Sequence, residues 1–153
     1  MQPAATHGSE ENMSVGRVAL QRARSYIMFD ISNIPPSANV TAATLRLCRT
    51  NGSGGASTHE LRAAQAPWTE SGLTWNTQPT LAPSASYTIS VPSSAGCVST
   101  NVTSDIQAWV LTAANFGWRI ADTNEATAPQ VDWATHENPT TGDRPTLSVT
   151  YTP

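Results

Sequence analysis

Short runs in which apolar and polar side chains alternate recur along almost the whole chain of 153 residues. A period of two places one face of a strand against a core and the other toward water. Glycine, proline and asparagine separate the runs, as they do at turns. We identify about nine such strands, at residues 13–22, 25–31, 40–49, 59–64, 87–91, 97–102, 116–120, 130–136 and 146–151. This pattern predicts an all-β fold, an antiparallel β-sandwich of jelly-roll type.

Two of the N-terminal runs predict how their strands are placed. In residues 13–22, Val18 and Leu20 fall on the face that we expect to point inward. Residues 25–31 are largely apolar on both faces, which is typical of a central strand covered on both sides.

One segment, residues 103–112, has the period of a helix instead. Ile106, Trp109 and Val110 are spaced i, i+3 and i+4, which puts all three on one face. The threonine and serine that open the segment are residues that cap helices. We therefore expect one short helix with Trp109 in the core.

The remaining chain organisation is simple. We expect residues 1–12 to be a flexible lead-in and residues 13–153 to form a single domain. No apolar run approaches the length that spans a bilayer, and the N-terminus has no signal pattern. Charged residues make up only 12% of the chain, the net charge is −3, and the basic residues are scattered. Phosphate binding needs clustered cations, so nucleic acid is excluded as a partner.

The two cysteines, Cys48 and Cys97, do not have the spacing of a metal site. They form either a disulfide or two buried thiols. We predict a disulfide if their strands are neighbours.

No catalytic residue is predicted. The chain has three histidines but no Gly-X-Ser-X-Gly turn for a nucleophilic serine. Its carboxylates lie in segments with turn chemistry, and Glu137 precedes Arg144, with which it could pair. A structural calcium ion is the one cofactor left open, with oxygen ligands at Asp122, Glu125 and Asp143.

Five tryptophans are the most suggestive feature of the composition. Sites that bind sugars use flat aromatic faces together with amides and carboxylates. Trp133, with Asp132 beside it, is our candidate for an exposed aromatic platform. The residues that we predict to contact a ligand are Trp133, Asp132, His136 and His59.

The segment from Trp68 to Asn76 combines two indoles, Trp68 and Trp75, with Glu70 and Asn76. Such a density of large and polar groups makes it either a structural lock or a binding surface. Together with the family resemblance described next, periodicity favours a lock in which Glu70 is satisfied internally, so that its removal would lower stability more than binding.

Several motifs, in order, resemble those of the DNRLRE domain family. They are residues 24–31, Ile34-Pro35, 40–47, 68–70, 73–76, 102–109, 115–117, 136–137 and 144–151. The resemblance implies a jelly-roll sandwich from secreted or surface multidomain proteins, similar to carbohydrate-binding modules and without catalytic activity. It also implies structural roles for Trp68, Glu70, Trp75, Asn76, Trp109, Glu137 and Arg144.

The chain departs from that family at its start, where only His7-Gly8-Ser9 remains of a first strand and turn. A missing strand leaves a sheet edge that a neighbouring domain or subunit could complete. We therefore expect an extracellular, non-catalytic module that binds polysaccharide. The alternative is a structural or adhesive domain of a surface fibre, completed by strand donation.

Overall fold

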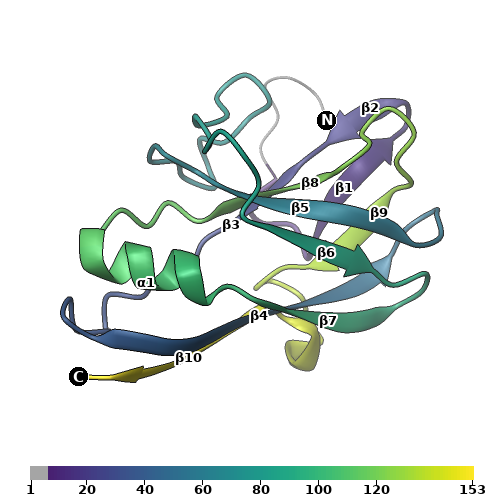
Figure 1. The fold of residues 1–153 in the computed structure, drawn as a ribbon. Coiled ribbons are helices and arrows are strands. Elements are labelled where there is room, and N and C mark those ends of the chain that lie inside the picture. The colour runs from purple at the N-terminus through teal and green to yellow at the C-terminus, as the bar shows by residue number, and fades with distance from the viewer. Residues whose placement is uncertain (1–6) are drawn as a thin grey trace.

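Two antiparallel sheets face each other across an apolar core in the computed structural model, which describes residues 7–153 (Figure 1). Within these residues there are ten strands, one α-helix and a 3-10 turn at Thr141–Asp143. The strands are β1 (Asn12–Val18), β2 (Gln21–Ala23), β3 (Ser25–Ile27), β4 (Asn39–Asn51), β5 (Ser57–Ala63), β6 (Tyr87–Val91), β7 (Gly96–Asn101), β8 (Trp118–Asp122), β9 (Val131–Ala134) and β10 (Thr146–Thr152). The prediction of an antiparallel β-sandwich with one short helix is confirmed.

The first sheet has the order β10-β4-β9-β1-β2, and β7 pairs with the other edge of β4. β9 and β10 lie end to end along one edge of β4, since Trp133 is opposite Arg49 while Thr146 is opposite Arg46. The second sheet has the order β3-β8-β5-β6. Alternate residues of both sheets fill the core between them, and Trp118 and Trp133 are among its largest fully buried side chains.

Helix α1 (Thr103–Thr112) has the bounds predicted from the sequence and closes one end of the sandwich (Figure 1). Trp109 packs on Trp118 with 4.6 Å between ring centroids, which confirms its place in the core. The expected cap at Thr103 or Ser104 is wrong, because the Asn101 carboxamide oxygen accepts the Thr103 N–H instead, at 3.0 Å. No helix in residues 7–153 is long and apolar enough to cross a membrane.

The first two runs fold differently from our expectation. Ala19 and Leu20 have φ values of 46° and 72°, so the chain turns there and splits residues 13–22 into β1 and β2. Leu20 is at the tip of this turn, 85% exposed, whereas the buried residues of β1 are Val15 and Gly16. β3 ends at Ile27 and lies at the edge of its sheet, not in its centre. Alternation alone does not show where a turn interrupts it.

Residues 7–11, in the segment that we assigned to a lead-in, contact the rest of the domain. Residues 1–6 lie outside the described part of the chain, but residues 7–11 make specific contacts. The Glu11 carbonyl accepts a hydrogen bond from the Thr135 N–H at 3.0 Å, and the Glu10 carbonyl accepts one from the Thr135 hydroxyl at 2.6 Å. Residues 10 and 11 are thus hydrogen-bonded to Thr135, the residue that follows β9.

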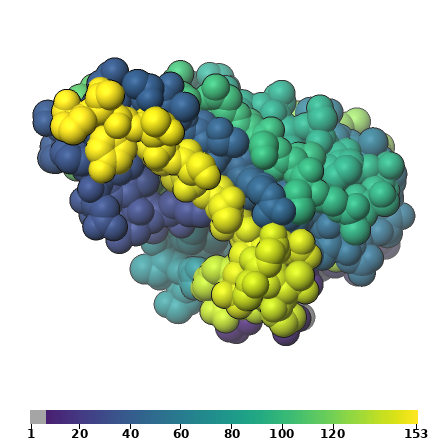
Figure 2. Space-filling model, turned by 90° about the horizontal axis from the view of Figure 1, so that it is seen from below, coloured from purple at the N-terminus to yellow at the C-terminus, as the bar shows by residue number. Residues whose placement is uncertain are grey.

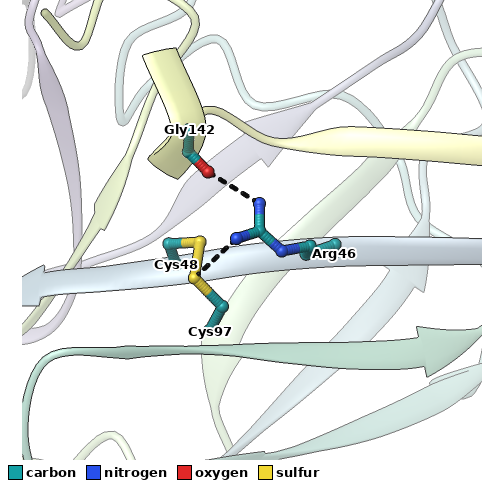
Figure 3. Close-up of a disulfide and its surroundings, with 4 residues drawn as sticks. All are labelled: Arg46, Cys48, Cys97 and Gly142. Atoms are coloured by element: carbon teal, nitrogen blue, oxygen red, sulfur yellow. Dashed lines mark hydrogen bonds between the residues drawn. A yellow bond between two sulfur atoms is a disulfide. The ribbon is translucent and has the colours of Figure 1, made fainter. Parts of the chain in front are cut away.

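The disulfide between Cys48 and Cys97 is confirmed (Figure 3). The two residues are directly opposite each other on β4 and β7. The Arg46 guanidinium lies over the bridge and donates to Cys97 Sγ at 3.0 Å and to the Gly142 carbonyl at 2.8 Å. The bridge thus links two neighbouring strands of the first sheet, and Arg46 connects it to the segment before β10.

Candidate functional site

A cleft of about 730 Å³ opens between the segment 68–78 and the N-terminal strands. One wall comes from residues 68–78 and the other from residues 23–29. The turn at residues 7–10 and residues 135–136 form the rim. Apolar and aromatic side chains cover most of its surface, including Tyr26, Met28 and Leu73. We call it the Trp68/Trp75 cleft.

Trp68 is held in a fixed orientation in one wall. Its indole Nε1 donates a hydrogen bond to the Phe116 carbonyl at 2.7 Å, and its ring contacts Tyr26 with centroids 5.6 Å apart and tilted by 60°. The indole remains half-buried, so part of it faces the cleft. An aromatic surface whose polar atom is already bonded can accept the apolar face of a ligand.

Trp75 carries a cation on its ring. The guanidinium carbon of Arg24 lies 4.7 Å from the indole centroid, and a bidentate bond to Glu125, at 2.6 and 2.8 Å, holds the guanidinium there. Gln78 joins the group, since its side-chain oxygen accepts from Arg24 and from the Tyr26 hydroxyl, both at 3.1 Å. This network fixes the segment 68–78 against the body of the domain.

The protonation states of this network follow from the contacts. The hydrogen bond from Arg24, outweighing the effect of partial burial, lowers the pKa of the Glu125 carboxyl. The same hydrogen bond raises the pKa of the Arg24 guanidinium. The pair is ionised throughout the neutral range, and its charges are satisfied by each other.

The rim of the cleft is polar and open to solvent. Glu70 lies 3.7 Å from His136, both side chains are more than half exposed, and His136 is 3.0 Å from Glu137 on its other side. The expectation that Glu70 is satisfied internally is therefore wrong. The turn at Gly8 packs directly on Glu70, because a Cβ added at Gly8 would lie 2.7 Å from the Cβ of Glu70.

An open aromatic cleft with a few fixed polar groups is the form of a small-ligand site. A family model of carbohydrate-binding modules, family 96, matches residues 1–151. This chain belongs to carbohydrate-binding module family 96. No curated protein matches it. The kinship with carbohydrate-binding modules that the motifs implied is thus confirmed, and the chain is a non-catalytic carbohydrate-binding module.

Two of the ligand contacts predicted for this family 96 module are inside the core. Trp133 is fully buried, and its Nε1 donates to Nδ1 of His59 at 3.1 Å. The expectation of an exposed platform at Trp133 is wrong because β9 lies between β4 and β1, and the side chain points between the sheets. His59 is also fully buried, 3.7 Å from Asp122, and burial lowers its pKa to about 4.

The other two predicted contacts are separated from each other. His136 lines the cleft. Asp132 does not: its carboxylate accepts hydrogen bonds from the Ser14 hydroxyl at 2.7 Å and from Gln130 at 3.0 Å. The predicted set is not one site in the structure, and only His136 remains a cleft residue.

The residues expected to be structural fall into two groups: some pack against the domain, and others are exposed or have partners that we did not expect. Trp68 and Trp75 are packed against the domain and line the cleft as well, so the two readings of this segment are not exclusive. Asn76 is exposed, and its side chain has no bonding partner among residues 7–153. Glu137 pairs with His136 rather than Arg144, whose Nε donates to the Asn138 carbonyl at 2.8 Å.

The carboxylates suggested as calcium ligands have other surroundings. Glu125 binds Arg24, and Asp122 lies buried beside His59 and accepts the Asn124 N–H at 2.7 Å. In the described part of the chain, the only three metal-type ligands that come together are Asp143 and the two cysteines. Those sulfurs are joined in the disulfide and are no longer thiolates.

Sequence reasoning missed the wall opposite the tryptophans. We expected Tyr26 and Met28 in a central strand at residues 25–31 and gave Arg24, just before it, no role, yet all three line the cleft because β3 is an edge strand that ends at Ile27. Their partners Gln78 and Glu125 are 54 and 101 residues away from Arg24 in sequence. No local pattern signals such contacts.

Proposed function

We propose that the Trp68/Trp75 cleft is the carbohydrate site of this module and that it takes a segment of a polysaccharide chain. The observation that carries the proposal is the convergence of two half-buried indoles and Tyr26 in one open cleft with fixed polar groups at its wall and rim. Pyranose rings have apolar C–H faces that stack on indoles, and hydroxyls at their edges that need hydrogen bonds.

The polar groups are placed to meet those hydroxyls. Gln78 and Arg24 lie in the wall, and Glu70 and His136 lie at the rim within the reach of a bound chain. Because Arg24, Glu125 and Gln78 already hold each other, little side-chain ordering remains when a ligand binds. An open cleft with an exposed rim suits an internal stretch of a long polymer, whose ends can leave on either side.

We further propose that the module acts outside the cell and holds a larger protein on its polymer. The disulfide between Cys48 and Cys97 supports an oxidising compartment. The ordered motifs shared with DNRLRE domains support attachment to other domains, since those domains are found in multidomain secreted proteins. The adhesive alternative would use the same fold without a sugar in the cleft.

Affinity electrophoresis against alginate, pectin, xylan and soluble β-glucan, with a pull-down on chitin, tests this proposal. We expect retention on at least one polymer, lost in Trp75→Ala and reduced in Trp68→Phe. Leu111→Ala is the matched control, because Leu111 is 63% exposed on α1 and does not line the cleft. Retention on none of the polymers, or equal retention of Trp75→Ala, would refute the assignment.

A further inference from the structure

Among residues 7–153, the outer edge of β10 has no partner strand. β10 ends the sheet order and pairs only with β4. Within residues 7–153, no backbone hydrogen bond outside that ladder reaches residues 146–152. Figure 2 shows β10, in yellow, running uncovered across one face of the molecule to the C-terminus.

The unpaired backbone groups can be identified from the neighbouring strand. The Ala43 N–H donates to Thr103 Oγ1 at 2.9 Å, and the Ala43 carbonyl accepts the Val102 N–H at 2.9 Å. Both groups of Ala43 are thus directed away from its register partner, Val149. Ala43 and Val149 therefore form a non-hydrogen-bonded pair, in which the backbone N–H and C=O groups of both residues point away from each other. The N–H and C=O of Val149 thus face the open edge. Leu147, two residues earlier, has the same orientation.

The sequence of β10 has none of the features that usually protect an edge. Residues 146–152, Thr-Leu-Ser-Val-Thr-Tyr-Thr, contain no charge, proline or glycine and are rich in β-branched and aromatic side chains. The other edges are protected. β2 and β3 have three residues each, β2 carries the exposed Arg22, and β6 meets β7 at a corner of the sandwich.

We propose that β10 is a dimerisation edge that pairs antiparallel with β10 of a second copy of this chain. A twofold axis through Val149 brings its outward N–H and C=O opposite the same groups of the second copy, so both form hydrogen bonds. It also places Ser148 opposite Thr150 of the second copy, and Leu147 opposite Tyr151. An uncharged strand meets itself without repulsion, and the first sheets of the two copies become one continuous sheet.

Sedimentation equilibrium from micromolar to millimolar protein tests the proposal. We expect the apparent mass to rise with concentration from the monomer value of 16.2 kDa toward twice that value. The double substitution Ser148→Lys with Thr150→Lys places like charges opposite each other across the twofold axis and should weaken the dimer at least about tenfold. Ser148→Lys with Thr150→Glu places opposite charges there and should retain it.

The two variants are matched in position and in exposure, since both side chains are on the solvent face of β10. Thermal unfolding at low concentration checks that each monomer folds as the wild type does. A strictly monomeric wild type at millimolar concentration would overturn the proposal, and so would equal dimerisation of the two variants. A monomer that captures an extended peptide at β10 instead would also overturn it in favour of strand donation by another chain.

Discussion

The guanidinium of Arg24 lies 4.7 Å from the centroid of the Trp75 indole while its Nε and Nη2 donate to the Glu125 carboxylate. One face of Trp75 is thereby covered by a cation that the protein itself holds in place. The position of the indole thus depends on a carboxylate 101 residues away from Arg24 in sequence.

We therefore predict that Glu125→Gln weakens carbohydrate binding without a contact to the ligand. Loss of the ionised partner frees Arg24, loosens the segment 68–78 and leaves a partly buried cation unpaired, which should lower stability by about 1–3 kcal/mol. Denaturant unfolding and affinity electrophoresis measure the two effects. Glu137→Gln is the control, because the Glu137 side chain is half-exposed and, among residues 7–153, pairs with His136 alone. Unchanged carbohydrate binding in Glu125→Gln would show that the position of Arg24 does not matter for the site.

The buried pair of His59 and Trp133 predicts a pH dependence of stability. The pKa of His59 is lowered from 6.5 to about 4, chiefly by burial, so between these values the unfolded chain binds a proton that the folded chain does not. The contribution of His59 to the free energy of unfolding is fully present above pH 6.5 and is lost as the pH falls toward 4. The loss is on the order of 3 kcal/mol. Denaturant unfolding between pH 4 and pH 8 measures it. In His59→Gln, which can still accept from Trp133, the slope in this window should shrink.

The contacts of Arg49 predict that even a conservative substitution there lowers stability strongly. Arg49 is 3% exposed, and its guanidinium donates to the carbonyls of Asn51, Gly54, Gly55 and Pro92. A lysine ammonium is a point charge with three donors and cannot reach four carbonyls from one position. Arg49→Lys should therefore lower the free energy of unfolding by about 2–4 kcal/mol, through lost bonds to a buried cation. Arg17→Lys, at a more exposed site that also binds carbonyls, should change it by less than about 0.5 kcal/mol.

The disulfide predicts a stability difference between oxidised and reduced protein. Cys48 and Cys97 close a loop of 49 residues, for which chain entropy gives a stabilisation of about 4 kcal/mol. Cys48→Ala with Cys97→Ala should lower the denaturation midpoint accordingly, at unchanged fold. Thiol titration of the denatured, unreduced wild type should find no free thiol. Two thiols per chain would contradict the bridge.

The sequence predicted the fold better than the site, for a physical reason. Alternation and helical period are local properties, so they placed α1 at residues 103–112 and put Cys48 and Cys97 in strands, but they did not show that these two strands are neighbours. Whether an alternating strand is central or at an edge depends on sheet order, which is not local. That is why Trp133 was expected at the surface and lies in the core, while Tyr26 was expected in a central strand and lines the cleft.

Replacing Glu70 tests whether the segment 68–76 is a structural lock or a binding surface. Its side chain is 57% exposed at the cleft rim, and among residues 7–153 its one ion-pair contact is His136 at 3.7 Å. An exposed pair at that distance contributes little, so Glu70→Ala should change the free energy of unfolding by less than about 0.5 kcal/mol. If the cleft binds sugar hydroxyls, the same substitution should weaken polysaccharide retention severalfold. Glu10→Ala is the control, since Glu10 is also at the rim but pairs with His7. A Glu70→Ala protein that is clearly destabilised yet retains full affinity would return this residue to a structural role.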